Sequence, residues 1–289
     1  MAELIEELAS AKINLTLHVL GRRPDGYHEI ESLVVFARYG DRLTLRPGEA
    51  TSFSLSGPFA SAIVGTNLLE TTVQRLIQAA PELRLGAVTL EKNLPVAAGL
   101  GGGSADAAAL LRAVQRANPR AASAIDWHAI AQSLGADVPV CLRGTPAMMG
   151  GIGERIVPLA SIPNASLVLV NPRLPVAAGD VYRRLGASAA PQHMQALEPP
   201  SLHSVQDLVR YAAARHNDLE TAAIALCPQI ADVKAVLEAT SGALIARMSG
   251  SGPTCFALFA TLDQASAAAT AVAQRRPNWW VVTTQVAAA

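Results

Sequence analysis

The sequence predicts an α+β protein of two domains, and three observations support this. Segments with an apolar residue at every second position, typical of strands, alternate with segments whose apolar residues recur every three or four positions, typical of helices. The 289 residues suit two modest domains or one large one. In the second half the expected order is strand, helices, strand, strand, helix, strand, which is typical of a ferredoxin-like βαββαβ sandwich. A proline-containing stretch at 158–163 divides the chain into predicted domains 1–160 and 161–289.

The expected elements of the first part follow in order. Residues 13–19 alternate strictly and predict a strand whose polar face carries Lys12 and Asn14. The predicted helix at 105–117 is rich in alanine and leucine and has the highest helix propensity in the chain. The remaining elements are a strand at 33–45 broken near Gly40, a helix at 67–80, a strand at 87–90 and a helix at 126–134.

The second part contains a long helical region between strands. The expected elements are a strand at 166–170, helices within 179–240, strands at 243–248 and 254–259, a helix at 263–275 and a strand at 279–286. A second glycine turn at 249–253 separates the two central strands.

Composition and charge narrow the function classes. Hydrophobic residues make up 51% and charged residues 16%, as in ordinary globular proteins. Lys plus Arg and Asp plus Glu both number 23, so the chain has no overall electrostatic attraction for nucleic acid or an anionic membrane. The three cysteines lack metal-binding spacing, and the N-terminus resembles neither a signal nor a transit peptide. We therefore expect a cytoplasmic protein with no nucleic-acid or membrane partner.

A glycine-rich loop joins a strand to a helix between Pro95 and Ser104. Four glycines allow close approach of the backbone to a ligand, and a serine follows them where the helix should begin; these residues are Gly99, Gly101, Gly102, Gly103 and Ser104. The N-terminus of a helix binds anions such as the phosphates of ATP. Neither GxGxxG nor the Walker A pattern is present. A turn that only packs strand on helix remains the structural alternative.

Several segments in order resemble the GHMP kinase superfamily. They are Lys12-Ile-Asn14, Gly26-Tyr27-His28, the glycine loop, Gly135-Ala-Asp137-Val-Pro139 and Gly250-Ser-Gly252-Pro253. The resemblance covers nearly the whole chain. It implies an ATP-dependent small-molecule kinase with an N-terminal domain like domain 2 of ribosomal protein S5 and a ferredoxin-like C-terminal domain. The stretch 23–30, RPDGYHEI, resembles the branch that phosphorylates the 2-hydroxyl of 4-diphosphocytidyl-2-C-methyl-D-erythritol in the non-mevalonate route to isoprenoids.

The resemblance also implies roles for individual residues. Asp137 corresponds to the catalytic base and Lys12 to the lysine beside it, a chemically reasonable pair for proton removal and charge stabilisation. Taken alone, an aspartate at this position is more often a helix cap or a surface charge. Implied substrate contacts are Asn14, Tyr27, His28, Tyr182, Gly250 and Gly252, with Tyr27, His28 and Tyr182 around a cytosine ring; for Tyr182, packing on the core is the alternative. Implied nucleotide contacts are Asn67, Leu68, Lys92, Pro95 and the glycine loop.

Some features leave questions open. Ala105 stands where related loops commonly have a second serine, and Ala97 and Ala98 stand where glycine is frequent. Mg²⁺ is expected to offset the phosphate charge, yet no carboxylate cage is visible and Ser104 is only one candidate ligand. Another GHMP kinase, acting on homoserine, mevalonate or a sugar, is the first alternative. A nucleotide-binding sensor without catalysis is the second. A monomer or weak homodimer is expected.

Overall fold

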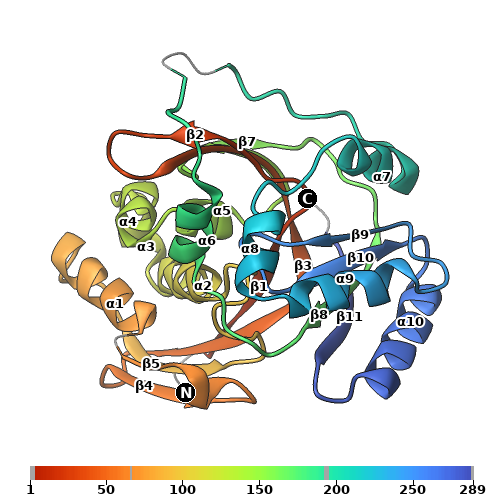
Figure 1. Cartoon of the computed structure of the whole chain (residues 1–289). Helices are drawn as coiled ribbons and strands as arrows, with labels where there is room; N and C mark the ends of the chain where they lie inside the picture. The colour runs from red at the N-terminus through yellow and green to blue at the C-terminus, as the bar shows by residue number, and fades with distance from the viewer. Residues whose placement is uncertain (1–3, 66, 192–194, 288–289) are drawn as a thin grey trace. The chain divides into compact units, whose positions relative to one another are not determined.

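The computed structural model describes residues 4–65, 67–191 and 195–287 (Figure 1). Two compact units divide the chain discontinuously. Among the described residues, the first unit contains 4–11, 39–96 and 101–144, and the second contains 12–38, 97–100 and 145–287. The predicted boundary between two sequence domains at residue 160 stays a prediction, because the compact units are defined by contacts and not by position along the sequence. Within these described ranges, no helix is both long and apolar enough to cross a membrane.

The second unit contains the ferredoxin-like sheet that the sequence predicts. Its strands are β8 (Ser166–Asn171), β9 (Ile245–Met248), β10 (Cys255–Phe259) and β11 (Trp280–Gln285). They lie in the order β11-β8-β10-β9, and all three pairings are antiparallel (Figure 1). Helices α9 (Gln229–Glu238) and α10 (Leu262–Arg275) pack on this sheet. Every residue of β8 and β10 is buried, so these two strands form the centre of the unit's core.

The rest of the second unit carries a hairpin and several short helices. Its strands are β2 (His18–Arg22), β6 (Ala147–Gly151), β7 (Arg155–Pro158) and the start of β3 (His28–Pro47). β3 pairs antiparallel with β2 and with β6, and β6 pairs with β7. The helices are α6 (Ala178–Leu185), α7 (Val205–Ala213) and α8 (Glu220–Leu226).

The first unit packs helices beside strands. Its strands are most of β1 (Ile5–Asn14), the end of β3, β4 (Ser52–Ser56) and β5 (Gly86–Glu91). Its helices are α1 (Leu68–Ala79), α2 (Gly102–Ala117), α3 (Pro119–Ala122), α4 (Trp127–Leu134), α5 (Val138–Arg143) and the 3₁₀ turn Ala60–Ala62. The buried, alanine-rich face of α2 contacts α1, α4 and α5. This packing holds the first turn of α2, which follows directly from the glycine loop.

Two strand predictions were wrong in detail. The predicted break near Gly40 is absent, and β3 runs through it. A Cβ at Gly40 would lie 2.0 Å from the carbonyl oxygen of Ala9, so glycine here permits close strand packing instead of ending the strand. The predicted strand 13–19 is interrupted, because β1 ends at Asn14 and β2 begins at His18. Its polar face is buried at Lys12 and Asn14 and exposed at His18. Lys12 and Asn14 are 4% and 1% exposed.

Candidate functional site

The glycine loop leads into α2 three residues earlier than predicted. Helix α2 begins at Gly102, and Gly101 precedes it in the left-handed conformation with φ 63°. The Ala105 N–H donates to the Gly101 carbonyl at 2.8 Å, the first α-type bond of the helix. The N–H groups of Gly102, Gly103 and Ser104 therefore have no acceptor within the helix. Together with the helix dipole they form a site suited to an anion.

The reason for glycine differs from one position of the loop to the next. A Cβ at Gly99 would lie 2.3 Å from the Ser249 carbonyl oxygen, so close packing within the second unit requires glycine there. At Gly102, within the first unit, a Cβ would lie 3.2 Å from the Lys92 ammonium. At Gly103 a Cβ would meet nothing within 4 Å, and φ is not positive. The protein itself therefore does not require glycine at 103, whereas a ligand that approaches the backbone would.

Lys92 lies beneath this first turn, in a buried ionic cluster. Its ammonium donates to Asp41 and, at 2.7 Å, to Asp106, and Lys92 is only 3% exposed. Asp41 also accepts from the N–H groups of Asn93 and Leu94, in the segment that leads into the glycine loop. The side chain of Lys92 thus supports the loop through Asp41 and Asp106, and its contact with adenine or ribose stays a prediction.

Burial and charge in this ionic cluster shift the pKa values of Asp106 and Lys92. Burial raises the pKa of Asp106 more than the Lys92 charge lowers it, and the Asp41 charge adds to the increase, so that the pKa reaches about 7. Burial alone would lower the pKa of Lys92, but the charges of Asp106 and Asp41 outweigh it and the pKa rises. Oδ1 of Asp106 is buried without a hydrogen-bond partner in the described part of the chain. Below about pH 7 the Asp106 carboxyl is therefore protonated beside the Lys92 ammonium.

The other predicted nucleotide contacts of the first unit have local roles as well. Oδ1 of Asn67 accepts from the Leu69 N–H at 3.1 Å and caps α1, whose first residue is Leu68. Pro95 is buried. These positions are compatible with main-chain or edge contacts to a ligand, which stay predictions.

Asp137 stands at the N-cap position of α5 but does not act as the cap. No hydrogen bond joins its side chain to the first N–H groups of that helix. Its main-chain carbonyl accepts from Cys141, and the residue is half-buried. By contrast, Asp126 at the start of α4 accepts from the Ala129 N–H at 2.9 Å. The cap interpretation therefore explains Asp126 and not Asp137.

In the second unit, Asn14 presents a buried oxygen that no described residue bonds. Its Nδ2 donates to Ser32 Oγ at 2.7 Å and its N–H to Ser249 Oγ at 3.1 Å. Oδ1 is buried without a hydrogen-bond partner among the described residues, and a Cβ at Gly250 would lie 3.3 Å from it. An unpaired buried acceptor costs free energy unless a ligand donates to it. Lys12, two residues earlier, donates its N–H to the Leu100 carbonyl at 2.9 Å.

The second glycine turn is tied to the glycine loop by residues that the sequence interpretation did not assign to the site. Ser249 Oγ donates to the Gly99 carbonyl at 3.0 Å. Asn217 donates from Nδ2 to the carbonyls of Met248 and Gly250, at 3.0 and 2.7 Å. Gly250 and Gly252 have φ of 55° and 78°. The only sequence signal for Ser249 is that it begins the second glycine turn at 249–253.

Two of the three predicted aromatic residues, His28 and Tyr182, lie together in the second unit. The rings of His28 and Tyr182 are 4.8 Å apart between centroids and tilted by 32°, while Tyr27 is 57% exposed. Burial, and then the charge of Arg22, lower the pKa of His28. A ring stacked between two others needs about 7 Å between them. A base stacked between His28 and Tyr182 would therefore require these two rings to separate, whereas the expected placement of Tyr27, His28 and Tyr182 around a cytosine ring stays a prediction.

Comparison with known proteins identifies close relatives. Residues 67–145 match the family described as GHMP kinases N terminal domain, and residues 195–278 match GHMP kinases C terminal. A Cereibacter sphaeroides protein named 4-diphosphocytidyl-2-C-methyl-D-erythritol kinase is 47% identical over 285 residues, which are 96% of this chain and 98% of that protein.

Solved structures agree with this relationship. A crystal structure of 4-(cytidine 5'-diphospho)-2C-methyl-D-erythritol kinase is 34% identical with a TM-score of 0.76, over 98% of this chain and 100% of that chain. A homoserine kinase from Cytophaga hutchinsonii is 18% identical with a TM-score of 0.69, over 99% and 95% of the two chains. At that identity the second structure supports the fold alone.

Proposed function

The chain belongs to the GHMP kinases and, among them, to the family of 4-diphosphocytidyl-2-C-methyl-D-erythritol kinases, and from this membership we propose its reaction. It transfers the γ-phosphoryl group of ATP to the 2-hydroxyl of 4-diphosphocytidyl-2-C-methyl-D-erythritol and releases ADP. The hydroxyl oxygen forms the new P–O bond, the bond from the γ-phosphorus to the β,γ-bridging oxygen breaks, and the hydroxyl proton leaves. This reaction belongs to the non-mevalonate route to isopentenyl diphosphate.

The observation that best supports phosphoryl transfer is the first turn of α2, whose N–H groups are not used within the helix. Three N–H groups lack helical acceptors there, and Gly103 has no structural reason to be glycine. Such a turn binds phosphate through its N–H groups and its dipole. Positioning and charge neutralisation supply most of the acceleration in this chemistry.

Two residues are proposed to act on the reacting hydroxyl. Asp137 accepts its proton, which agrees with a carboxylate that does not cap its own helix. Lys12 stabilises the negative charge that develops on the transferred group. Asn14 orients the hydroxyl, since its Oδ1 is buried and lacks a partner among the described residues.

Mg²⁺ is proposed to accompany ATP. Magnesium typically binds one or two carboxylates together with substrate phosphates. In the described residues no group of three or more His, Cys, Asp or Glu side chains could hold a metal ion. Ser104, in the first turn of α2, would supply one oxygen, and the metal would neutralise charge on the phosphates. The residues fit an ion brought in by the nucleotide.

The proposed cytidine site consists of Tyr27, His28 and Tyr182. Each stacking contact with the base would contribute about 1 kcal/mol. The lowered pKa of His28 keeps its imidazole neutral near pH 7, so that it has one donor and one acceptor nitrogen for the base. A cytoplasmic location, a monomeric or weakly dimeric state and the absence of a nucleic-acid partner also remain proposals.

The reaction is tested by coupled ADP release from ATP with the cytidine diphosphate substrate. Folded protein should turn over, and Asp137→Asn should reduce kcat by several orders of magnitude while ATP still binds. Asp126→Asn is the matched control, because it changes a similar aspartate that only caps α4. Absence of turnover by the wild-type protein would contradict the assignment, and near-normal kcat for Asp137→Asn would remove it from the mechanism.

Competition by CDP separates the alternatives. CDP should raise the apparent KM for the substrate, since it carries the proposed cytidine determinant. A kinase for homoserine, mevalonate or a sugar would be insensitive to CDP. Binding of ATP and CDP without any phosphoryl transfer would instead indicate a sensor.

A further inference from the structure

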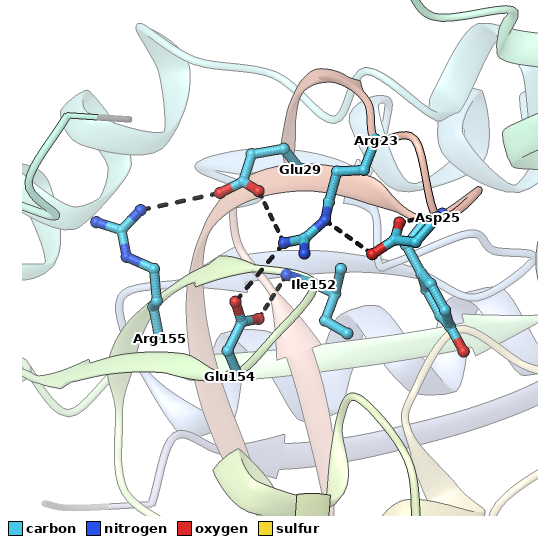
Figure 2. A network of polar contacts seen from close by, with 7 residues as sticks. Arg23, Asp25, Glu29, Ile152, Glu154 and Arg155 are labelled. Carbon is cyan, nitrogen blue, oxygen red and sulfur yellow. Dashed lines mark hydrogen bonds and ion pairs between the residues drawn. The ribbon is translucent and has the colours of Figure 1, made fainter. Parts of the chain in front are cut away.

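A cluster of charged side chains surrounds the loop that carries Tyr27 and His28. The loop joins β2 to β3 in the second unit. The cluster consists of Arg23, Asp25, Glu29, Glu154 and Arg155 (Figure 2). Three carboxylates thus face two guanidinium groups.

Arg23 is at the centre of the cluster. Its Nε donates to Asp25 Oδ2 at 3.2 Å and its Nη1 to Glu29 Oε2 at 3.4 Å. The same Nη1 lies 3.9 Å from Glu154 Oε1 (Figure 2). One planar guanidinium therefore joins its own loop, the start of β3 and the turn between β6 and β7. A lysine has one ammonium and no such fork.

The arrangement of Arg23 is transmitted to the main chain of Tyr27. Asp25, which Arg23 holds, accepts the Tyr27 N–H through Oδ1 at 3.1 Å. The Arg23 N–H donates to the Tyr27 carbonyl at 2.8 Å, and the Gly26 N–H donates to the Arg23 carbonyl at 3.1 Å. The main chain of Tyr27 is thus bonded to Arg23 itself through its carbonyl and to Asp25 through its N–H, and the Arg23 side chain holds Asp25. His28 follows Tyr27 directly.

The outer partners of Arg23 are themselves fixed. Glu154 accepts the Ile152 N–H at 2.6 Å and fills the space that a Cβ at Gly151 would occupy, 2.2 Å from its Oε1. The side chain of Glu29 is 6% exposed. Arg155 lies 3.8 Å from Glu29 and donates to the Gln195 carbonyl, but within the described part of the chain no hydrogen bond or ion pair joins it to residues 23–28. Arg23 is therefore the link from these fixed groups to the loop, and Arg155 is not.

We propose that Arg23 is a positioning residue for recognition of the cytidine end of the substrate. It holds the 23–28 loop against Glu29 and Glu154, so that Tyr27 and His28 meet the base in one arrangement. This inference rests on the proposed function. It adds a specificity determinant that contacts neither the base nor the reacting atoms.

The test compares Arg23→Lys with Arg155→Lys, two changes that keep the charge next to Glu29. Arg23→Lys should raise KM for the cytidine diphosphate substrate about tenfold, because the loop samples other arrangements before binding. Its kcat and its KM for ATP should stay unchanged. Arg155→Lys should leave all three values unchanged. An equal rise in KM for both variants, or a loss confined to kcat, would overturn the proposal.

Two further measurements keep the test decisive. Turnover by the wild-type protein tests the proposed function separately, before any variant is compared. Hydrogen exchange in 22–29, measured on the free protein, should be faster in Arg23→Lys than in Arg155→Lys; equal exchange would overturn the positioning role whether or not the wild type turns over. If Arg23→Lys does not fold, Glu154→Gln, which removes one outer partner, should show the same KM shift to a smaller degree, and an unshifted KM counts against the proposal.

Discussion

The carboxylate of Asp106 lies 2.7 Å from the ammonium of Lys92, in the interior of the first unit and beneath the first turn of α2. Both residues are buried, with Asp106 2% and Lys92 3% exposed. Asp41 contacts the same ammonium, so two carboxylates share one cation. In these surroundings the Asp106 carboxyl favours its protonated form, so the stability of the protein should depend on pH.

We predict that Asp106→Asn flattens the pH dependence of stability. The folded-state pKa of Asp106, about 7, lies above its ordinary value of 3.8, so its favourable contribution is complete below pH 3.8 and is lost as pH rises through 7. Asparagine mimics the protonated acid and cannot ionise. The variant should therefore gain stability relative to the wild type as pH rises from about 4 to about 7, as denaturant unfolding would measure.

Asp41→Asn is the control for this prediction. It weakens the bonds to Asn93 and Leu94 as well as the pair with Lys92. Breaking a buried ion pair costs roughly 3–5 kcal/mol, so this variant should be destabilised at every pH tested. Parallel pH profiles for the wild type and Asp106→Asn would contradict the assignment of the proton.

Gly103→Ala should separate ligand binding from folding. Alanine is favoured over glycine in a helix by up to about 1 kcal/mol, and nothing lies within 4 Å of the new Cβ, so the melting temperature should not fall. KM for ATP should rise about tenfold or more, because the methyl group displaces the phosphates from the N–H groups. Gly179→Ala, at an equally open position in α6, is the control and should leave KM for ATP unchanged. An unchanged KM in Gly103→Ala would favour the purely structural turn.

Ala97→Gly should stabilise the protein. Ala97 has φ of 51°, in the left-handed region that disfavours a side chain. That conformation costs an alanine roughly 1–2 kcal/mol, part of which the added flexibility of glycine in the unfolded chain cancels. We expect a gain of about 0.5–1 kcal/mol in the free energy of unfolding. Ala98→Gly, at a buried neighbouring position, should instead lose stability.

Much of the fold could be predicted because periodicity is local. The helix at 67–80 and the ferredoxin-like order of the second part follow from spacing and turn residues, and the structure confirms them. Gly40 could not be interpreted from the sequence, since its purpose is contact with Ala9, which lies far from it along the chain. For the same reason the alternation around Lys12 and Asn14 predicted a polar face but could not indicate that both residues are buried.

The candidate site shows a similar limit. The resemblance supplied residue types and positions, but it did not indicate which groups touch a ligand and which support those that do. Lys92 was predicted to lie near the nucleotide, but nothing in the sequence indicated that its side chain pairs with Asp41 and Asp106. The four loop glycines also looked equivalent, yet packing against Ser249 explains Gly99 and leaves Gly103 for a ligand.

His28 should titrate below the ordinary histidine value of 6.5, because burial and then the charge of Arg22 disfavour its protonated form. A lowered folded-state pKa means that the contribution of His28 to stability is complete above pH 6.5 and is lost as pH falls through the folded value. Affinity for CDP should decrease over the same range if the neutral ring binds the base. NMR titration of the His28 ring measures the midpoint, and Arg22→Gln should move it upward by removing one cause. A midpoint at or above the ordinary value in the wild type would contradict this account of His28.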